Sequence, residues 1–402
     1  MYKFKISAPG TVFLYGDPKL EVAEYNKPCI AAGLDIRTTL EFSSPFPKAV
    51  PEKMITIEFI NLKLYLKIPL EAIYKCFCDE RVVREFSCEN LMNTIKDFIK
   101  SLNILDSDVC KTIKKLWNLF LESFLYLFLR IAYEEGMKIT ASFFVRLWTD
   151  LPLAKNLGST TSFMVCLAAC FWRWSLLQKE IVRYTFDSQD CTEIRRHVWC
   201  CEKIVYNCKN TINNFISIYG DMMMCKDEID MFTLRKIKPI KILIVDSNIN
   251  RKRRFDRLKE WKNLDQYIDS IIIHAALDKS FEAIERVFQK FRKEDQEKND
   301  TNLTGLLSLD SYVKILDFIN MTQDVLKARG LSNQNIDFIC AIARKYSFGC
   351  KMTGTGRYVL IFALPHIMDH DISLLKNELE FYNYHVIETT MSCDGVRIER
   401  FI

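Results

Sequence analysis

Two segments in the amino-terminal part of the chain alternate apolar and polar residues. One covers the first forty residues, and the other covers residues 138–152. The apolar face of the second segment consists of Ile139, Ala141, Phe143, Val145 and Leu147. Because successive side chains of a β-strand point to opposite faces, the pattern predicts half-buried antiparallel strands.

A long helical pattern lies between these two segments. Residues 112–136 are long enough for a core helix, and an apolar stripe runs along them. Asn118, Glu122 and Arg130 interrupt the apolar residues. We expect these three side chains to keep the opposite face of the helix in contact with solvent.

A second block begins near residue 230 and contains both kinds of pattern. Strand patterns cover residues 240–247, 357–365 and 384–390. Helical patterns extend to about residue 290 and cover residues 308–330, and the polar run 291–302 predicts a solvated loop.

Strands and helices therefore follow one another in mixed order along the chain. Regular alternation would favour a doubly wound sheet, whereas mixed order favours an α+β fold. A chain of 402 residues with 49% hydrophobic residues is long enough for two domains with a large core. We expect an amino-terminal domain of residues 1–228 and a carboxyl-terminal domain of residues 229–402.

The charge of the chain is nearly balanced. Lys and Arg number 56 against 51 Asp and Glu, and the charges are spread along the sequence, so we expect no nucleic-acid partner. The longest apolar runs, such as residues 163–172, are shorter than the ~20 residues that cross a bilayer, so we also expect no membrane span.

Fifteen cysteines occur in a long chain that begins with the strand-like "MYKFKISAP" and has no signal-peptide pattern. This predicts reduced cysteines and a cytoplasmic location. Close pairs such as Cys200 and Cys201 lack the spacing of zinc ligands.

The stretch "LPLAKNLGSTTSFMVCLAAC" (151–170) combines a strand end, a glycine, three hydroxyl residues and an apolar helix. Backbone N–H groups at a helix start carry partial positive charge, and Gly158 allows a ligand to approach the backbone. The hydroxyls of Ser159, Thr160 and Thr161 suit phosphate or magnesium. An ordinary helix N-cap is the alternative, because Ser and Thr serve that purpose equally well.

Two further motifs, "SAPGTVFLYGDP" (7–18) and "KMTGTGRYVLIFAL" (351–364), flank this stretch in sequence. Together the three motifs resemble, in the same order, those of the galactokinase, homoserine kinase, mevalonate kinase and phosphomevalonate kinase superfamily. The mevalonate kinases are the most similar branch, because likeness extends to "NKPCIAAGLDIRT" (26–38), "LDFINMTQDVLKARGLS" (316–332) and "ETTMSCDGVRIE" (388–399).

The resemblance implies a two-domain fold with ATP, Mg²⁺ and substrate bound in the cleft between the domains. Thr160 and Glu202 would hold the magnesium ion. The residues expected to bind ATP are Lys155, Asn156, Leu157, Gly158, Ser159, Thr160, Thr161, Gly354, Gly356 and Arg251.

A physical argument, apart from the resemblance, also points to Glu202. Ile194, Val198, Cys201 and Val205 form one helical stripe, and Glu202 lies ~40° from Val198 around the helix axis. A carboxylate at the border of a buried face needs a partner. The partner is either a metal ion or a nearby arginine in a salt bridge.

The chain departs from the family pattern at the positions of two catalytic residues. Thr11 stands where mevalonate kinases have a lysine, and Asn213, eleven residues after Glu202, stands where they have an aspartate. Asp17-Pro18 replaces a Glu-His pair, and Arg357 begins a run of side chains in place of glycines. Lys155, Arg357 and Arg251 could supply a replacement cation, or each could be a solvated surface charge.

The sequence thus supports a mevalonate kinase-like phosphotransferase, ATP + mevalonate to ADP + 5-phosphomevalonate, with reduced activity. Loss of a general base usually removes ~10²- to 10⁴-fold in rate, but positioning and charge stabilisation dominate phosphoryl transfer and can survive. A pseudokinase that binds a nucleotide or a partner is the alternative, and a kinase with another acceptor is a third. Mevalonate is the expected small-molecule partner, and the resemblance is compatible with a homodimer.

Overall fold

The computed structural model describes residues 2–16, 28–45, 53–77, 87–102, 110–153, 157–208, 212–225, 231–234, 239–248, 279, 281–287, 289–290, 309–328, 330–354, 356–363 and 369–400. The strands are β1 (Tyr2–Tyr15), β2 (Cys29–Ser44), β3 (Met54–Phe59), β4 (Leu64–Pro69), β5 (Phe143–Thr149), β6 (Met222–Cys225), β7 (Met231–Leu234), β8 (Ile240–Asp246), β9 (Gly349–Met352), β10 (Tyr358–Phe362), β11 (Val386–Met391) and β12 (Arg397–Glu399). The helices are α1 (Leu70–Phe77), α3 (Cys88–Ser101), α4 (Lys111–Glu134), α5 (Ser159–Gln178), α6 (Ser188–Tyr206), α7 (Ile212–Tyr219), α10 (Leu309–Ala328), α11 (Gln334–Lys345) and α12 (Asp369–Phe381).

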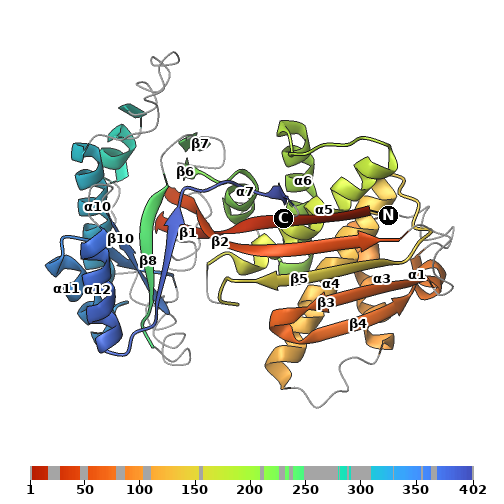
Figure 1. Ribbon diagram of the computed structural model, residues 1–402, viewed down its shortest axis with the longest axis horizontal. Helices are drawn as coiled ribbons and strands as arrows, with labels where there is room; N and C mark the ends of the chain where they lie inside the picture. Colours follow the sequence, from red (N-terminus) through yellow and green to blue (C-terminus); the bar gives the residue numbers. More distant parts are fainter. Residues whose placement is uncertain are drawn as a thin grey trace.

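One mixed sheet runs through both halves of the molecule (Figure 1). Its strand order is β4-β3-β5-β2-β11-β8-β10-β9, and β1, β6, β7 and β12 pair beside this path. Helices α3 to α6 gather in one half and α10 to α12 in the other (Figure 1). The expected α+β fold is confirmed, whereas the domain boundary near residue 228 stays a prediction.

The strands predicted in the amino-terminal half are confirmed, but β1 and β2 are buried on both faces along most of their length, so only β5 has the expected half-buried pattern. The first forty residues form most of β1 and β2, which pair antiparallel over nearly their whole length. β5 begins at Phe143, so Ile139 and Ala141 precede it, and its buried side chains include Phe143, Val145 and Leu147. β5 pairs antiparallel with β2 but parallel with β3.

The predicted core helix is α4, but the expectation of a wet polar face is wrong for two of its three residues. Glu122 and Arg130 are both buried. Arg130 donates to the Tyr126 hydroxyl at 3.0 Å and forms an ion pair with Glu134 at 2.8 Å. Polar partners supplied by neighbouring turns thus allow charged groups to lie inside the core.

Helices α4 and α5 are long and apolar enough, by composition, to cross a membrane. In this structure, however, 78% and 83% of their most apolar segments are buried inside the protein. α5 packs on β1, β2, α4 and α6. Core packing therefore accounts for the apolar character of both helices.

The predictions for the carboxyl-terminal block are also confirmed where the structure describes it. β8, β10 and β11 match the three strand patterns, and α10 matches the long helical pattern. The predicted loop 291–302 lies outside the described residues.

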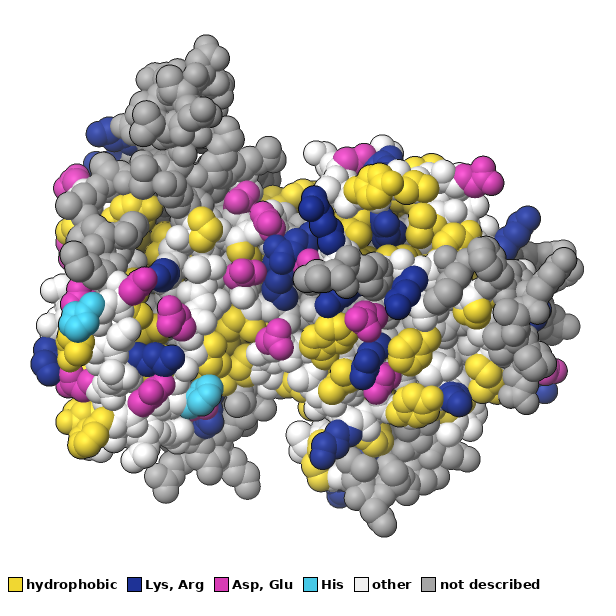
Figure 2. All heavy atoms as spheres, in the orientation of Figure 1, with side chains coloured by type: hydrophobic (Ala, Val, Ile, Leu, Met, Phe, Trp, Pro, Cys, Tyr) yellow, Lys and Arg dark blue, Asp and Glu magenta, His cyan; other side chains and the backbone are white. Residues whose placement is uncertain are grey.

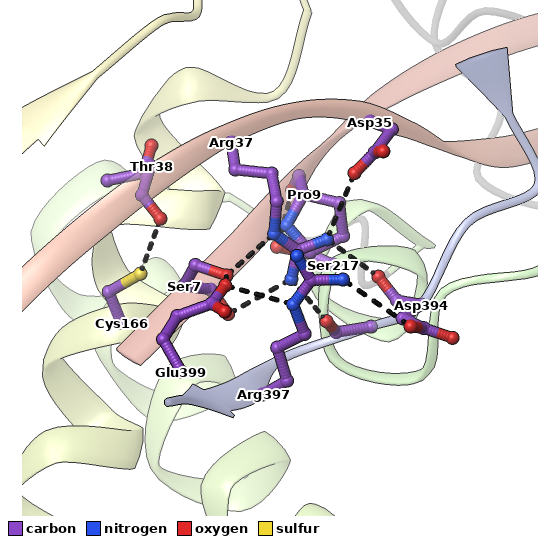
Figure 3. Close-up of polar contacts among 11 residues, drawn as sticks. Ser7, Pro9, Asp35, Arg37, Thr38, Cys166, Ser217, Asp394, Arg397 and Glu399 are labelled. Atoms are coloured by element: carbon purple, nitrogen blue, oxygen red, sulfur yellow. Dashed lines mark hydrogen bonds and ion pairs between the residues drawn. The ribbon is translucent and has the colours of Figure 1, made fainter. Parts of the chain in front are cut away.

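The last described residues return to the amino-terminal half, where β12 pairs with β1. Figure 3 shows the buried guanidinium of Arg37 at the centre of this contact. Arg37 donates to the hydroxyl of Ser7 at 2.6 Å and to the carbonyl oxygens of Asp394 and Gly395 at 2.9 and 2.6 Å. The Ser7 hydroxyl in turn donates to Glu399. These bonds fix the end of the chain on its first strand.

One face of the molecule carries mixed charge. On the face drawn in Figure 2, Lys and Arg side chains are interspersed with Asp and Glu side chains over both halves.

Candidate functional site

The first motif lies on β1, where it contacts both of the other motifs. The amide of Thr11 donates to the carbonyl oxygen of Leu157, in the central motif, at 3.0 Å. The amine of the buried Lys351, in the third motif, donates to the carbonyl oxygen of Phe13 at 3.0 Å. Three segments far apart in the sequence are thus joined along one strand.

Gly158 is the residue at which the central motif turns into α5. It has φ 76°, in the left-handed region, and a Cβ there would lie 2.7 Å from the amide nitrogen of Thr11. Only glycine permits this close approach without strain. The 20-residue helix α5 begins at this turn, and the N–H groups at a helix start carry the partial positive charge that favours an anion.

The hydroxyl of Thr11 faces this turn and lacks a partner. Thr11 is 1% exposed, and its Oγ1 has no hydrogen bond in the part of the chain that the structure describes. Oγ1 would lie 2.9 Å from a Cβ on Gly158. A buried hydroxyl without a partner is rare and indicates that a ligand or water completes its hydrogen bonding.

Glu202 lies on the buried face of α6, as its position in the helical stripe predicts. The Thr161 hydroxyl, from α5, donates to Oε1 at 2.9 Å, and the Asn214 amide, from α7, donates to Oε2 at 2.9 Å. Three helices therefore bring one carboxyl group and two neutral polar groups together beside the glycine turn. No lysine or arginine forms an ion pair with Glu202 among the described residues, so the salt-bridge alternative gains no support.

The environment of Glu202 favours its neutral form. Burial raises the pKa of Glu202 to about 7, and the hydrogen bonds from Thr161 and Asn214 oppose this effect only partly. A positive ion near the carboxyl group would lower this pKa again, because it stabilises the charged form that water no longer solvates.

The two residues that bond Glu202 are the sequence neighbours of two predicted site residues, Thr160 and Asn213, whose predicted roles stay predictions. Thr160 is half-buried, and the hydroxyl bonded to Glu202 is that of Thr161, the next residue. Asn213 is half-buried, and the amide bonded to Glu202 is that of Asn214. Asn214 was missed by the sequence analysis, although a polar residue on the buried face of a helix is a signal that could have found it.

The third motif is held by contacts within the carboxyl-terminal half. Gly356 has φ 63° and its carbonyl oxygen accepts a hydrogen bond from Ser247 at 2.6 Å. Arg357 donates to Asp246 at 2.6 Å. The guanidinium suggested as a replacement cation is thus paired with a carboxylate, which reduces its capacity to neutralise a phosphate. Gly354 is buried beside this turn.

Several predicted residues fall on parts of the chain that the structure leaves undescribed. These are Lys155, Asn156, Arg251, Asp17 and Pro18. Their predicted roles stay predictions.

The residues around Glu202 fit a magnesium ion bound together with a triphosphate. Glu202, Thr161 and Asn214 offer oxygen atoms, the ligand type that Mg²⁺ prefers, and Oδ1 of the fully buried Asn214 has no partner among the described residues. The described residues hold no group of three or more His, Cys, Asp or Glu side chains arranged for a metal. One carboxylate with phosphate oxygens and water is a usual ligand set for Mg²⁺ in ATP-dependent enzymes.

Comparisons with known proteins point to one kind of enzyme. No protein-family model matches the chain. The mevalonate kinase of Homo sapiens is 22% identical over 405 residues, which cover 98% of this chain and 94% of that protein. The mevalonate kinase of Arabidopsis thaliana is 22% identical over 360 residues, 88% of each chain.

Solved structures show the same likeness in three dimensions. The Methanococcus jannaschii mevalonate kinase superimposes with a TM-score of 0.61 at 15% identity and covers 99% of both chains. The chain has the mevalonate kinase fold. A Lactococcus lactis galactokinase complexed with galactose reaches a TM-score of 0.57 at 13% identity, covering 98% of this chain and 94% of its own. The expected resemblance to this kinase superfamily is therefore confirmed.

Proposed function

We propose that the protein transfers the γ-phosphoryl group of Mg-ATP to the primary hydroxyl of mevalonate and forms 5-phosphomevalonate for isoprenoid biosynthesis, at a reduced rate. The near-full-length likeness to proteins named mevalonate kinase supports this substrate pair. An L. major mevalonate kinase, solved in complex with R-mevalonate, is similar to this chain with a TM-score of 0.54 at 12% identity, covering 98% of this chain and 97% of its own.

The glycine turn and the start of α5 would hold the triphosphate. The N–H groups of the first turn of α5 donate to phosphate oxygens, and Gly158 leaves room for them to approach. Glu202 and a hydroxyl in the first turn of α5, that of Thr160 or Thr161, would hold the magnesium ion. When bound, magnesium neutralises charge on the β- and γ-phosphates during transfer.

The acceptor end of the site would work without a general base. The mevalonate hydroxyl oxygen forms a bond to the γ-phosphorus while the bond from that phosphorus to the bridging oxygen of ADP breaks. The hydroxyl proton passes to a phosphoryl oxygen or to water, because the amide of Asn213 cannot accept it. Thr11 offers a hydroxyl where the family has a lysine, so less charge stabilisation is available and the rate is lower.

The observation that carries this proposal is the buried Glu202 carboxyl group beside the glycine turn, with only neutral partners and no counter-charge among the described residues. A coupled ADP-release assay on purified protein, with and without mevalonate, tests it. We expect ADP release that depends on both magnesium and mevalonate.

The second candidate is a pseudokinase that binds nucleotide without turnover. The loss of both the family's lysine and its aspartate, at Thr11 and Asn213, favours this candidate. Nucleotide-dependent thermal stabilisation without ADP release from mevalonate or other small alcohols would support it, whereas release with another alcohol would indicate a changed acceptor.

Assembly as a homodimer and a cytoplasmic location complete the proposal. The homodimer rests on the resemblance, and the cytoplasmic location rests on the cysteines and the lack of a signal-peptide pattern in the sequence. Analytical ultracentrifugation measures the first, and cell fractionation measures the second.

A further inference from the structure

Asn214 is a polar residue of the site that the sequence did not predict. It is fully buried on α7, its Nδ2 donates to Oε2 of Glu202 at 2.9 Å, and its Oδ1 has no partner among the described residues. An amide oxygen buried without a partner costs about 1–3 kcal/mol, so a bound group that completes it is favoured.

The position of Asn214 is fixed by contacts other than its own side chain. The hydroxyl of Ser217, also on α7, donates to the carbonyl oxygen of Pro9 on β1 at 2.9 Å. The amide of Val396 donates to the carbonyl oxygen of Ile218 at 3.0 Å. α7 is therefore anchored to the first motif and to the carboxyl-terminal segment, and replacement of the Asn214 side chain leaves these anchors in place.

The two hydrogen bonds to Glu202 also fix the direction of its carboxyl group. Thr161 occupies Oε1 and Asn214 occupies Oε2, each with one donor. A carboxylate oxygen accepts more than one bond, so each oxygen keeps a lone pair for another group. Because both donors are neutral, they orient the carboxylate without supplying the positive charge that burial removes.

We propose that Asn214 is a positioning residue for divalent-cation binding: its amide holds the Glu202 carboxylate toward a cation bound with nucleotide beside the Gly158 turn. This inference rests on the proposed nucleotide site and adds a residue to it. It concerns cation binding and is independent of whether mevalonate is phosphorylated.

The chain offers a matched control for the same chemistry elsewhere. Asn118 on α4 donates through Nδ2 to Oε1 of the buried Glu122 at 2.6 Å. Both residues of this pair lie on one helix, and neither is bonded to α5 or α7 in the described structure. Asn118→Leu thus removes an equivalent amide–carboxyl bond that involves neither α5 nor α7.

The test measures Mn²⁺ binding, in the presence of a non-hydrolysable ATP analogue, by electron paramagnetic resonance at one fixed pH. We expect Asn214→Leu to weaken Mn²⁺ binding by about 10- to 100-fold, the usual contribution of a hydrogen bond to a charged group. Binding of the analogue in the presence of chelator should change little, and Asn118→Leu should bind Mn²⁺ as the unaltered protein does.

Each outcome decides the inference. Unchanged Mn²⁺ affinity in a folded Asn214→Leu protein overturns it, as does an equal loss in Asn118→Leu. If Asn214→Leu does not fold, Asn214→Ser, whose hydroxyl is too short to reach Glu202, decides by the same measurement. If the unaltered protein binds Mn²⁺ and nucleotide but releases no ADP with mevalonate, the proposed kinase function fails while this inference stands.

Discussion

Two buried glutamates, Glu122 on α4 and Glu202 on α6, differ in the origin of their partners. Each accepts a hydrogen bond from an asparagine amide, and burial raises the pKa of each. The partner of Glu122 lies on the same helix, one turn away. The partners of Glu202 come from two other helices, and one of them, Thr161, lies in the first turn of α5, directly after Gly158.

The comparison shows that burial of a carboxyl group is not by itself a functional signal. Glu122 is a core residue whose hydrogen-bond donor, Asn118, lies on the same helix. Glu202 is bonded to the first turn of α5, and Oδ1 of its asparagine partner, Asn214, has no hydrogen bond within the described residues. Convergence of separate elements on one charged group, with unused hydrogen-bonding capacity, is the stronger indication of a site.

The largest expected effect is on how the free energy of unfolding depends on pH, and it distinguishes the two glutamates. Below about pH 4.5, Glu202 is protonated in both folded and unfolded chains. Between about pH 4.5 and 7 the unfolded chain loses this proton while the folded chain keeps it, so the free energy of unfolding falls as pH rises, by about 3 kcal/mol in total. Denaturant unfolding in chelator should show this fall in the unaltered protein and a smaller fall in Glu202→Gln.

The same experiment with Mg²⁺ and an ATP analogue sharpens the result. Cation binding should remove the fall that belongs to Glu202, whereas the contribution of Glu122, which has the same sign, should remain. Equal behaviour of Glu122→Gln and Glu202→Gln would mean that both glutamates are structural.

The next effect concerns cation binding at a single pH. Glu202→Gln should lower the affinity for Mg²⁺ with nucleotide by about 100-fold, because a neutral amide replaces the carboxylate that is bonded to Thr161 at the start of α5. Glu122→Gln should leave that affinity unchanged. Titration calorimetry measures both, and unfolding of Glu202→Gln without ligand would favour a structural role instead.

A third effect tests whether Gly158 is needed for its close approach to Thr11 as well as for its positive φ. Gly158→Ala should destabilise the protein by about 2 kcal/mol more than Gly136→Ala, from the overpacking against Thr11. Gly136 has φ 63° but no atom within 4 Å of the added Cβ, so it measures the backbone strain alone. Equal losses of stability in the two variants would show that the turn at Gly158 accommodates the added methyl group without further loss.

The smallest expected effect tests whether the residues near Glu202 support phosphoryl transfer to mevalonate. Thr11→Lys should raise mevalonate phosphorylation by about 10-fold by adding positive charge, although the longer side chain must fit beside Gly158. Asn213→Asp alone should gain little, since an isolated carboxylate near the γ-phosphate resists ionisation. Together they should exceed the product of the single effects, with a coupling of about 1–3 kcal/mol. Absence of turnover in all four proteins, with nucleotide binding retained, would favour the pseudokinase.

Sequence patterns predicted most of the elements that carry the site. Alternation in the first forty residues and the stripe around Val198 depend only on the strand and helix periods, so β1, β2 and the buried side of α6 could be assigned. The wet face assigned to Glu122 was wrong, because helical spacing does not show whether a neighbouring element covers a polar residue. The roles of Thr160 and Asn213 were expected from the likeness to mevalonate kinases and stay predictions, whereas the contacts of Thr161 and Asn214 with Glu202 appear only in the packed structure.

By itself, the sequence determined the periods of its elements, the glycine turn before α5, and the likeness to mevalonate kinases. Tertiary structure alone decided which side chains meet. Thr161, Glu202 and Asn214 lie on three helices whose relative rotation is set by packing against β1, β2 and one another. A shift of one residue along a helix turns a side chain by about 100°, so adjacent residues such as Asn213 and Asn214 have different surroundings that only the packed structure can distinguish.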